Sequence, residues 1–188
     1  MKRLVVLLGL VMIAATGLVF AEAPAPATGI RAELLWQINS AADKLVELAE
    51  ATPAEKYSWR PAEGVRSISE VYVHVSDANY LLAQMIGIKP PKPYDEKMEK
   101  MVTDKAKIIA DLKESMDYLR KLVTDMPDAD LDKPADLFGT KTTVRGALFG
   151  FIAHMHEHLG QSIAYARSNK VTPPWTAKEQ AAKAQEKR

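Results

Sequence analysis

The feature that most constrains this chain is an apolar pattern with a helical period that recurs in four separate segments. In residues 30–51, apolar side chains return every three or four positions, which places them on one face of a helix. The same spacing runs through residues 67–87, about 95–126 and 143–168. Elsewhere no stretch alternates between apolar and polar residues for more than a few positions, so strands are not expected. Four amphipathic helices must bury their apolar faces together, which predicts an all-α fold, a four-helix bundle.

The ends of these segments carry helix start and stop signals. Ser67 and Glu70 have the spacing of a capping box, so a helix should begin at Ser67. Pro53 ends the helix before it, and three prolines within residues 89–93 exclude a helix there. The stretch 127–141 has turn-forming residues and is long enough either to turn back or to cross the bundle. The helix connectivity therefore stays open at this stage.

The first 21 residues have the order of a secretory signal peptide. Lys2 and Arg3 precede an uncharged, mostly apolar run at 4–20, and small residues follow. We expect cleavage after Ala21 and a periplasmic or secreted protein. The alternative is an uncleaved anchor, because the run is just long enough to reach the lower limit for a membrane-spanning helix. Contact with a membrane is expected only in that case.

Length and composition suit one domain with a sizeable core. The chain has 188 residues, and 47% of them are hydrophobic. The expected division is a signal peptide at 1–21, a linker at 22–29, the bundle at 30–168 and a polar tail at 169–188.

Charge and cysteine content exclude several function classes. The 25 basic residues barely exceed the 24 acidic ones, and removal of Lys2 and Arg3 leaves 23 against 24. Such a chain has no basic surplus to neutralise phosphates, so we do not expect nucleic acid as a partner. The absence of cysteine excludes thiolate metal ligands, disulfides, a cysteine nucleophile and covalently attached haem.

The histidines are the candidate functional residues. His154 and His158 are four positions apart and share one helix face, whereas His156 between them points away. Phe151 and Tyr165 lie on the same stripe as the pair, which turns the pair toward the bundle interior. Two histidines at this spacing can bind one metal ion.

A third ligand must come from another helix. His74 lies on the side of its helix that carries Val71 and Ala78, so it also can face inward. Alone, such a histidine is most simply a hydrogen-bonded core residue. Together with the pair it forms a three-histidine set, and a divalent ion would satisfy all three buried imidazoles. Three nitrogen ligands leave positions open for water or substrate, as in catalytic sites.

Two carboxylates lie near these histidines in the sequence. Asp77 and Glu157 are candidates to orient a ligand imidazole or to accept a proton from bound water, and the alternative for both is exposed charge. His156 is expected at the outer surface or in contact with a ligand residue. A ferritin-like di-iron site is excluded because neither His74 nor His158 has Glu three positions before it.

Two stretches resemble the DinB-like family. Residues 57–80, YSWRPAEGVRSISEVYVHVSDANY, resemble its second-helix region, which has an aromatic and proline loop, a serine-capped helix start and one ligand histidine. Residues 154–167, HMHEHLGQSIAYAR, resemble its last bundle helix, with His-x-x-x-His followed by Gly-Gln. By position, the resemblance places the three metal ligands of the family on His74, His154 and His158.

The resemblance implies further properties. These are an up-down-down-up bundle, a site at one end of it, often a homodimer, and a structural or supporting role for Gly160 and Gln161. The bound ion in such proteins is nickel or zinc and sometimes another divalent metal, and the sequence does not choose among them. Some relatives are thiol-dependent transferases or isomerases. Their thiol cofactors are cytosolic, so the expected export of this chain weakens the transfer of that activity to it.

Three functions remain open. The first is a metal-dependent hydrolase or transferase for a small-molecule substrate, in which Trp59, Tyr72 and Tyr165 either shape the pocket or pack in the core. The second is a non-catalytic periplasmic metal-binding or structural bundle protein. The third is a scaffold that retains the histidines and acts through its surface.

Overall fold

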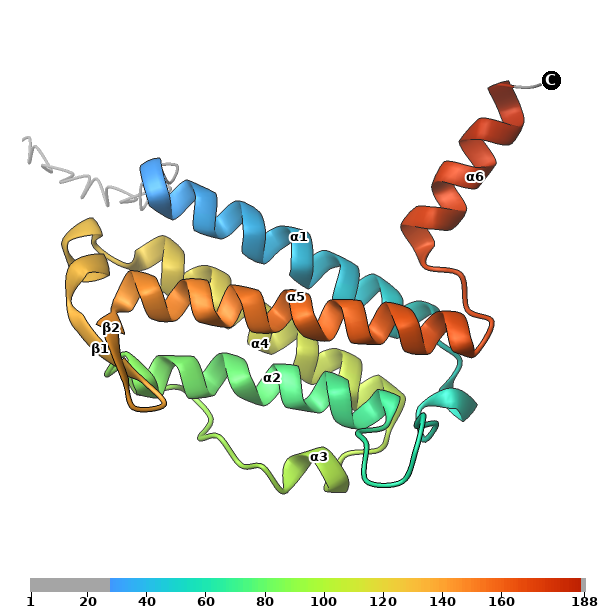
Figure 1. Cartoon of the computed structure of the whole chain (residues 1–188), viewed down its shortest axis with the longest axis horizontal. Helices are drawn as coiled ribbons and strands as arrows, with labels where there is room; N and C mark the ends of the chain where they lie inside the picture. Colours follow the sequence, from blue (N-terminus) through green and yellow to red (C-terminus); the bar gives the residue numbers. More distant parts are fainter. Residues whose placement is uncertain (1–27, 187–188) are drawn as a thin grey trace, which may run out of the picture.

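The computed structural model describes residues 28–186, so the expected signal peptide at 1–21 lies outside the described residues. Within this range the chain is mainly helical (Figure 1). Four long helices form a bundle, as the sequence predicted. They are α1 (Gly29–Ala51), α2 (Ile68–Met85), α4 (Lys105–Asp125) and α5 (Val144–Ser168). Among residues 28–186, no helix combines the length and apolar character needed to cross a bilayer.

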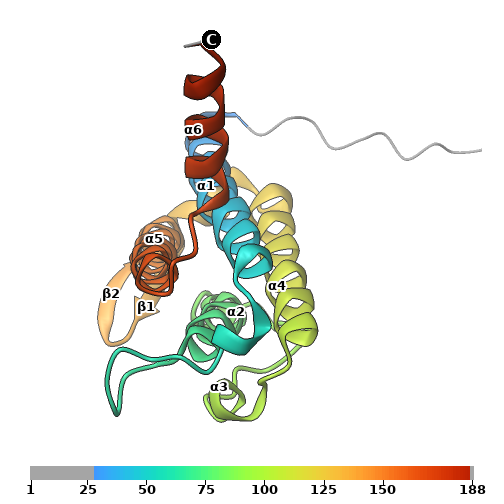
Figure 2. The same ribbon diagram turned by 90° about the vertical axis from the view of Figure 1, so that its right-hand side faces the viewer.

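The helices occupy the corners of a square. α1 packs against α4 and α5, and α2 packs against the same two helices, so α1 and α2 are diagonal (Figure 2). α1 and α5 run in one direction and α2 and α4 in the other, the up-down-down-up order that the resemblance implies (Figure 1). Because α2 and α4 are parallel, the segment 86–104 runs back along the bundle and forms the crossover. Residues 127–141, the stretch that the sequence left open as a possible crossover, turn the chain back instead.

The apolar faces meet in one continuous core. Large side chains from all four helices have almost no exposed surface, and full burial of such a side chain contributes roughly 1.5–3 kcal/mol. They include Leu34, Ile38, Leu45, Leu48, Tyr72, Leu82, Ile108, Leu112, Met116, Leu119 and Leu148.

The capping box at the start of α2 is confirmed. Ser67 Oγ accepts a hydrogen bond from the Glu70 amide at 3.3 Å, and Glu70 Oε2 accepts one from the Ser67 amide at 2.7 Å. These bonds fix where α2 begins, about two turns before His74.

The predicted third helix, about 95–126, is wrong in its first part. The structure has a single turn, α3 (Met98–Met101), and α4 then begins at Lys105. Asp104 caps α4, since its Oδ1 accepts a hydrogen bond from the Lys107 amide at 2.8 Å. The apolar spacing continues across this break because Val102 is buried within it, so the pattern did not reveal two helices.

A small hairpin lies in the segment where no strand was expected. After the short 3-10 turn Asp128–Asp132, strand β1 (Pro134–Leu137) pairs antiparallel with β2 (Thr140–Thr143). Phe138 and Gly139 form the tip, and both have positive φ, 53° and 87°. A second 3-10 turn, Ala54–Lys56, follows α1.

The tail contains one more helix, α6 (Pro174–Glu186), which projects away from the bundle (Figures 1 and 2). It has no buried residue, in keeping with its polar sequence. Trp175 is partly buried against the core, and Lys44 of α1 lies 6.0 Å from the centre of its ring.

Candidate metal centre

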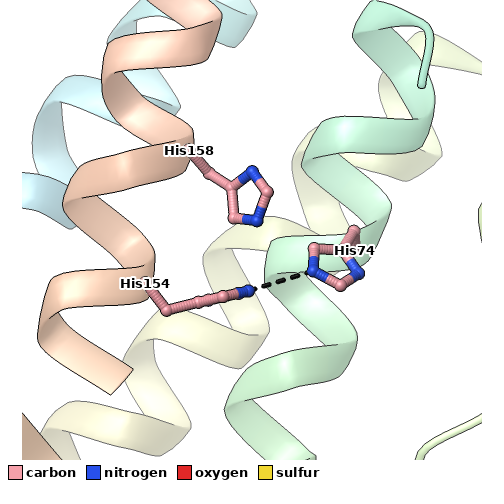
Figure 3. Close-up of side chains that lie close together, drawn as sticks. All are labelled: His74, His154 and His158. Atoms are coloured by element: carbon pink, nitrogen blue, oxygen red, sulfur yellow. Dashed lines mark hydrogen bonds between the residues drawn. The ribbon is translucent and has the colours of Figure 1, made fainter. Parts of the chain in front are cut away.

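The three histidines singled out by the sequence meet between α2 and α5 (Figure 3). One ring nitrogen from each lies within 4.8 Å of the other two. The ring centres are 4.4 Å apart for His154 and His158, and 5.0 Å and 4.8 Å from His74 to these two. The helical pair and the distant histidine therefore face one common point.

The expected location at one end of the bundle is wrong. His154 and His158 lie near the middle of α5, which runs from Val144 to Ser168. His74 lies in the first half of α2, which is antiparallel to α5 (Figure 1). The stripe that carries the pair lies about halfway along its helix, so the cluster opens on the side of the bundle, between α2 and α5.

His74 is oriented by Glu99, on the turn α3. Its Nδ1 lies 2.6 Å from Glu99 Oε1, and Arg66 donates to both oxygens of the same carboxylate at 2.7 and 3.1 Å. Burial raises the pKa of Glu99, but the hydrogen bonds from Arg66 and His74 outweigh it and lower that pKa overall. An ionised acceptor at this distance assigns the proton of His74 to Nδ1. Its Nε2 then directs a lone pair toward the other histidines.

His158 is oriented by Gln161. Its Nδ1 lies 2.8 Å from Gln161 Oε1, and Gln161 Nε2 donates to the hydroxyl of Tyr165 at 2.9 Å. Because the amide nitrogen is engaged by Tyr165, the amide oxygen faces His158 and accepts its Nδ1–H. Tyr165 in turn packs edge-on against Trp59, with ring centres 5.2 Å apart. Gln161 thus has the supporting role that the resemblance implies.

His154 differs from the other two histidines. Its Nε2 lies 3.0 Å from His74 Nε2, and its Nδ1 is buried without a hydrogen-bond partner among residues 28–186. Burial, followed by the charges of His158 and His74, lowers its pKa to about 4. Burial and the charge of Arg66 also lower the pKa of His74. Both imidazoles are therefore neutral at pH 7, the form that binds metal.

The donor set fits a divalent ion. Two imidazole nitrogens bound tetrahedrally to zinc, each at roughly 2.0–2.1 Å, lie roughly 3.3 Å apart. The 3.0 Å separation of His74 Nε2 and His154 Nε2 is close to this value. Two lone pairs facing each other at such a distance repel unless a proton or cation lies between them.

The carboxylates expected from the sequence do not contact the histidines. Glu157 is exposed. Asp77 has one buried oxygen without a hydrogen-bond partner among residues 28–186, and its pKa is raised to about 6 by burial and by neighbouring carboxylates. His156 is half-buried rather than on the outer surface. Sequence reasoning missed Glu99, which is 25 residues from His74 and reaches it only through the crossover.

Two hollows adjoin the cluster. An apolar cavity of about 230 Å³ is bordered by His74 and His154. A wider polar hollow of about 570 Å³ reaches Glu99 and Gln161, the residues that orient His74 and His158, and is also lined by Arg60 and Lys100. Tyr72 lines neither hollow and is 1% exposed. It therefore packs in the core, which is the second of the two roles that the sequence left open for it.

Comparison with known proteins yields one family and several structural relatives. Residues 37–162 match the model of the DinB superfamily. The uncharacterised protein YjoA of Bacillus subtilis is 30% identical over 124 residues, which cover 64% of this chain and 79% of that protein.

Three solved structures share the fold. A DinB-like protein from Bacillus cereus superposes with a TM-score of 0.67 at 20% identity, covering 75% of this chain and 93% of that one. The structure of YjoA gives 0.60 at 24% identity, covering 74% and 93%. YfiT from Bacillus subtilis, described as a probable metal-dependent hydrolase with an unusual four-helix bundle topology, gives 0.61 at 16% identity, covering 81% and 95%.

Proposed function

The chain belongs to the DinB superfamily, and from this premise we propose that it binds one divalent metal ion through His74, His154 and His158. Zinc and nickel are among the ions that imidazole ligands suit, and we propose one of these two. With such an ion bound, we propose that the protein acts as a metal-dependent hydrolase or transferase on a small-molecule substrate.

One observation carries the proposal. The Nδ1 atoms of His74 and His158 each face an acceptor, Glu99 or Gln161, so both Nε2 lone pairs point to the common centre. Histidines that bind metal typically donate their other ring N–H to a carboxylate or carbonyl oxygen. The hydrogen bond between His74 Nε2 and His154 Nε2 accounts for His74 without an ion, but His158 is held in the same orientation by Gln161, and an ion would engage all three rings.

The residues around the centre have separable roles. Arg66 keeps Glu99 ionised, and ionised Glu99 increases the basicity of His74. Gln161 fixes the ring of His158 through its contact with Tyr165. Three nitrogen ligands leave a coordination position open, and the ion, when bound, would polarise a substrate oxygen or lower the pKa of a water molecule. The description of YfiT as a probable metal-dependent hydrolase agrees with the hydrolytic option.

A second candidate is a non-catalytic metal-binding protein, and one feature favours it. Glu99, the carboxylate in contact with the cluster, has both oxygens engaged by Arg66 and His74. It is not free to accept a proton from a bound water molecule. Hydrolysis by this centre would therefore depend on the ion and on the substrate for proton transfer.

The two candidates are tested together. Mature protein purified without a His tag is analysed for metal, then assayed against esters, lactones and amides. About one ion per chain, with turnover that is lost in His74→Ala, would support the enzyme. Tight binding of one ion without turnover would support the second candidate. No bound ion after incubation with zinc, nickel, copper or manganese would exclude both.

We also propose that the protein is exported, on the pattern of residues 1–21. The mature protein would then begin at Glu22. Cell fractionation and the mass of the intact protein test this, and a cytoplasmic chain that retains its first 21 residues would contradict it.

A further inference from the structure

The residues that line the apolar cavity beside the histidines favour one kind of ligand group. Its walls come from α2, α5, the crossover and the hairpin, and none of the described residues that line it carries a fixed charge. Its apolar lining includes Ala78, Leu81, Leu137, Phe138 and Phe151. His74 and His154 form its edge toward the candidate metal centre, and Tyr94 of the crossover is the other polar residue that lines it. Among the apolar side chains, away from the histidine edge, a charged group would lose its hydration without gaining a partner.

The size of the cavity matches a small ring. It measures about 230 Å³, and an apolar cavity of roughly 150 Å³ is already sufficient to bind benzene. A phenyl group or an alkyl group of similar volume therefore fits, with room for a polar group at the histidine edge.

The tip of the hairpin gives an independent indication. Phe138 has a φ of 53° and is 72% exposed. The left-handed region is unfavourable for a bulky aromatic residue, and a two-residue turn of this kind favours Asn-Gly. Because the Phe138 ring is mostly exposed, it contributes little to the stability of the fold. Neither its backbone conformation nor its packing therefore explains a phenylalanine at this position. Strained residues of this kind cluster at functional sites.

The hairpin is fixed against α5 rather than free. Both strands contact α5, and Gly150 leaves room for the end of the Leu137 side chain, since an added Cβ would lie 2.7 Å from Leu137 Cδ2. Leu137 and Gly150 both line the cavity, and Phe138 follows Leu137 directly at its rim. The hairpin therefore forms one wall of a cavity whose opposite edge is the candidate metal centre.

We propose that the centre takes an uncharged substrate with a phenyl-sized apolar group, which this cavity holds while the polar group lies at the edge formed by His74 and His154. This inference rests on the proposed function, because it assigns a substrate class to the same site. In it, Phe138 is a specificity-determining residue that covers the apolar group.

The test compares two ligands with the same metal-binding group. Benzohydroxamic acid and acetohydroxamic acid are titrated into the zinc-loaded mature protein. Burial of the phenyl ring predicts roughly 10- to 100-fold tighter binding of the benzo compound. The ratio measured with zinc ions in solution gives the baseline.

Two variants then locate the ring. Ala78→Leu fills the cavity, so it should weaken the binding of benzohydroxamic acid much more than that of acetohydroxamic acid and bring the ratio close to the baseline. Phe138→Asn creates an Asn-Gly turn, so the melting temperature should stay equal or rise, while benzohydroxamic acid binding should weaken roughly 3- to 10-fold. Trp36→Ala removes another exposed aromatic residue, 68% exposed on α1 and outside the cavity, and should change neither ratio nor affinity.

Two results would overturn the inference without touching the metal centre, provided that the protein binds zinc. One is an affinity ratio in the unaltered protein equal to the ratio with zinc ions in solution, and the other is a ratio that Phe138→Asn leaves unchanged. Failure to bind zinc would overturn the proposed function. Titration of the metal-free protein with toluene, followed by NMR, still decides whether the cavity takes a ring. Shifts confined to the cavity residues would support it, and their absence would overturn it.

Discussion

The α1–α4 side of the bundle and the α2–α5 side use polar groups differently. On the α1–α4 side, the last carbonyl groups of each helix accept hydrogen bonds from a side chain of the other helix. Arg31, near the start of α1, donates to the carbonyls of Thr124 and Met126 at the end of α4, at 2.9 and 3.0 Å. Lys105, at the start of α4, donates to the carbonyls of Glu50 and Thr52 at the end of α1, at 2.8 and 2.7 Å. These bonds satisfy carbonyls that a helix leaves unpaired.

On the α2–α5 side, polar groups occupy the middle of the interface instead. Three partly exposed imidazoles face one another there, and their inward nitrogens have no carboxylate or carbonyl partner. On the first side the polar groups find their partners within the chain, whereas on the second the proposed cation would supply the partner that the three imidazoles share. Stability and chemistry are thus assigned to opposite sides of one core.

The largest expected effect is on metal affinity. His154→Ala combined with His158→Ala removes two of the three ligands and should weaken binding by about 1,000-fold or more, roughly 4 kcal/mol. Helical circular dichroism should persist because the α1–α4 side is untouched. His156→Ala, on the same helix, should bind normally in equilibrium dialysis. Equal affinity in the double variant would place the ion elsewhere.

A substitution in the core of the α1–α4 side should lower the stability of the fold without changing metal binding. Leu112→Ala on α4 removes a fully buried side chain and should lower the free energy of unfolding by about 3 kcal/mol. Urea unfolding measures this. One ion per folded chain should still bind, and a parallel loss of metal stoichiometry would show that the two sides are not separable.

Removal of the Glu99 charge should have a smaller effect. Glu99→Gln leaves a neutral acceptor beside His74 and should reduce metal affinity about 10- to 100-fold. Glu157→Gln, next to His158 in sequence but exposed, is the matched control and should bind as the unaltered protein does. If the two variants behave alike, Glu99 has no role in orienting His74.

The smallest effect concerns Asp77, which has no partner for one buried oxygen. Its pKa in the folded protein is raised from 3.8 to about 6, so the folded state binds a proton more tightly than the unfolded state. Stability contributed by this group therefore rises as pH falls from 6 toward 3.8, and the ionised form is destabilising above pH 6. Asp77→Asn should stabilise the metal-free protein by about 1 kcal/mol at pH 8, after allowance for partial exposure, and by less at pH 5. Urea unfolding at the two pH values tests this, and an equal effect at both would contradict it.

Sequence periodicity predicted the helices and the histidine cluster for the same reason. The four-residue step from His154 to His158 and the side of His74 on its own helix are local properties of an α-helix. The contact of Glu99 with His74 depends instead on the path of residues 86–104, which no spacing encodes. The hairpin strands have four residues each, too few for an alternating pattern.

The path of the chain also sets the order in which the centre assembles. His154 and His158 are adjacent as soon as α5 forms, whereas His74 is 80 residues away from His154 and arrives only when α2 docks. Local contacts form early in folding, and contacts between distant segments form late. A metal ion that meets the chain during folding therefore finds two ligands first. Full affinity at the proposed centre would appear only with the native packing of α2 on α5, so metal capture there would report that folding is complete.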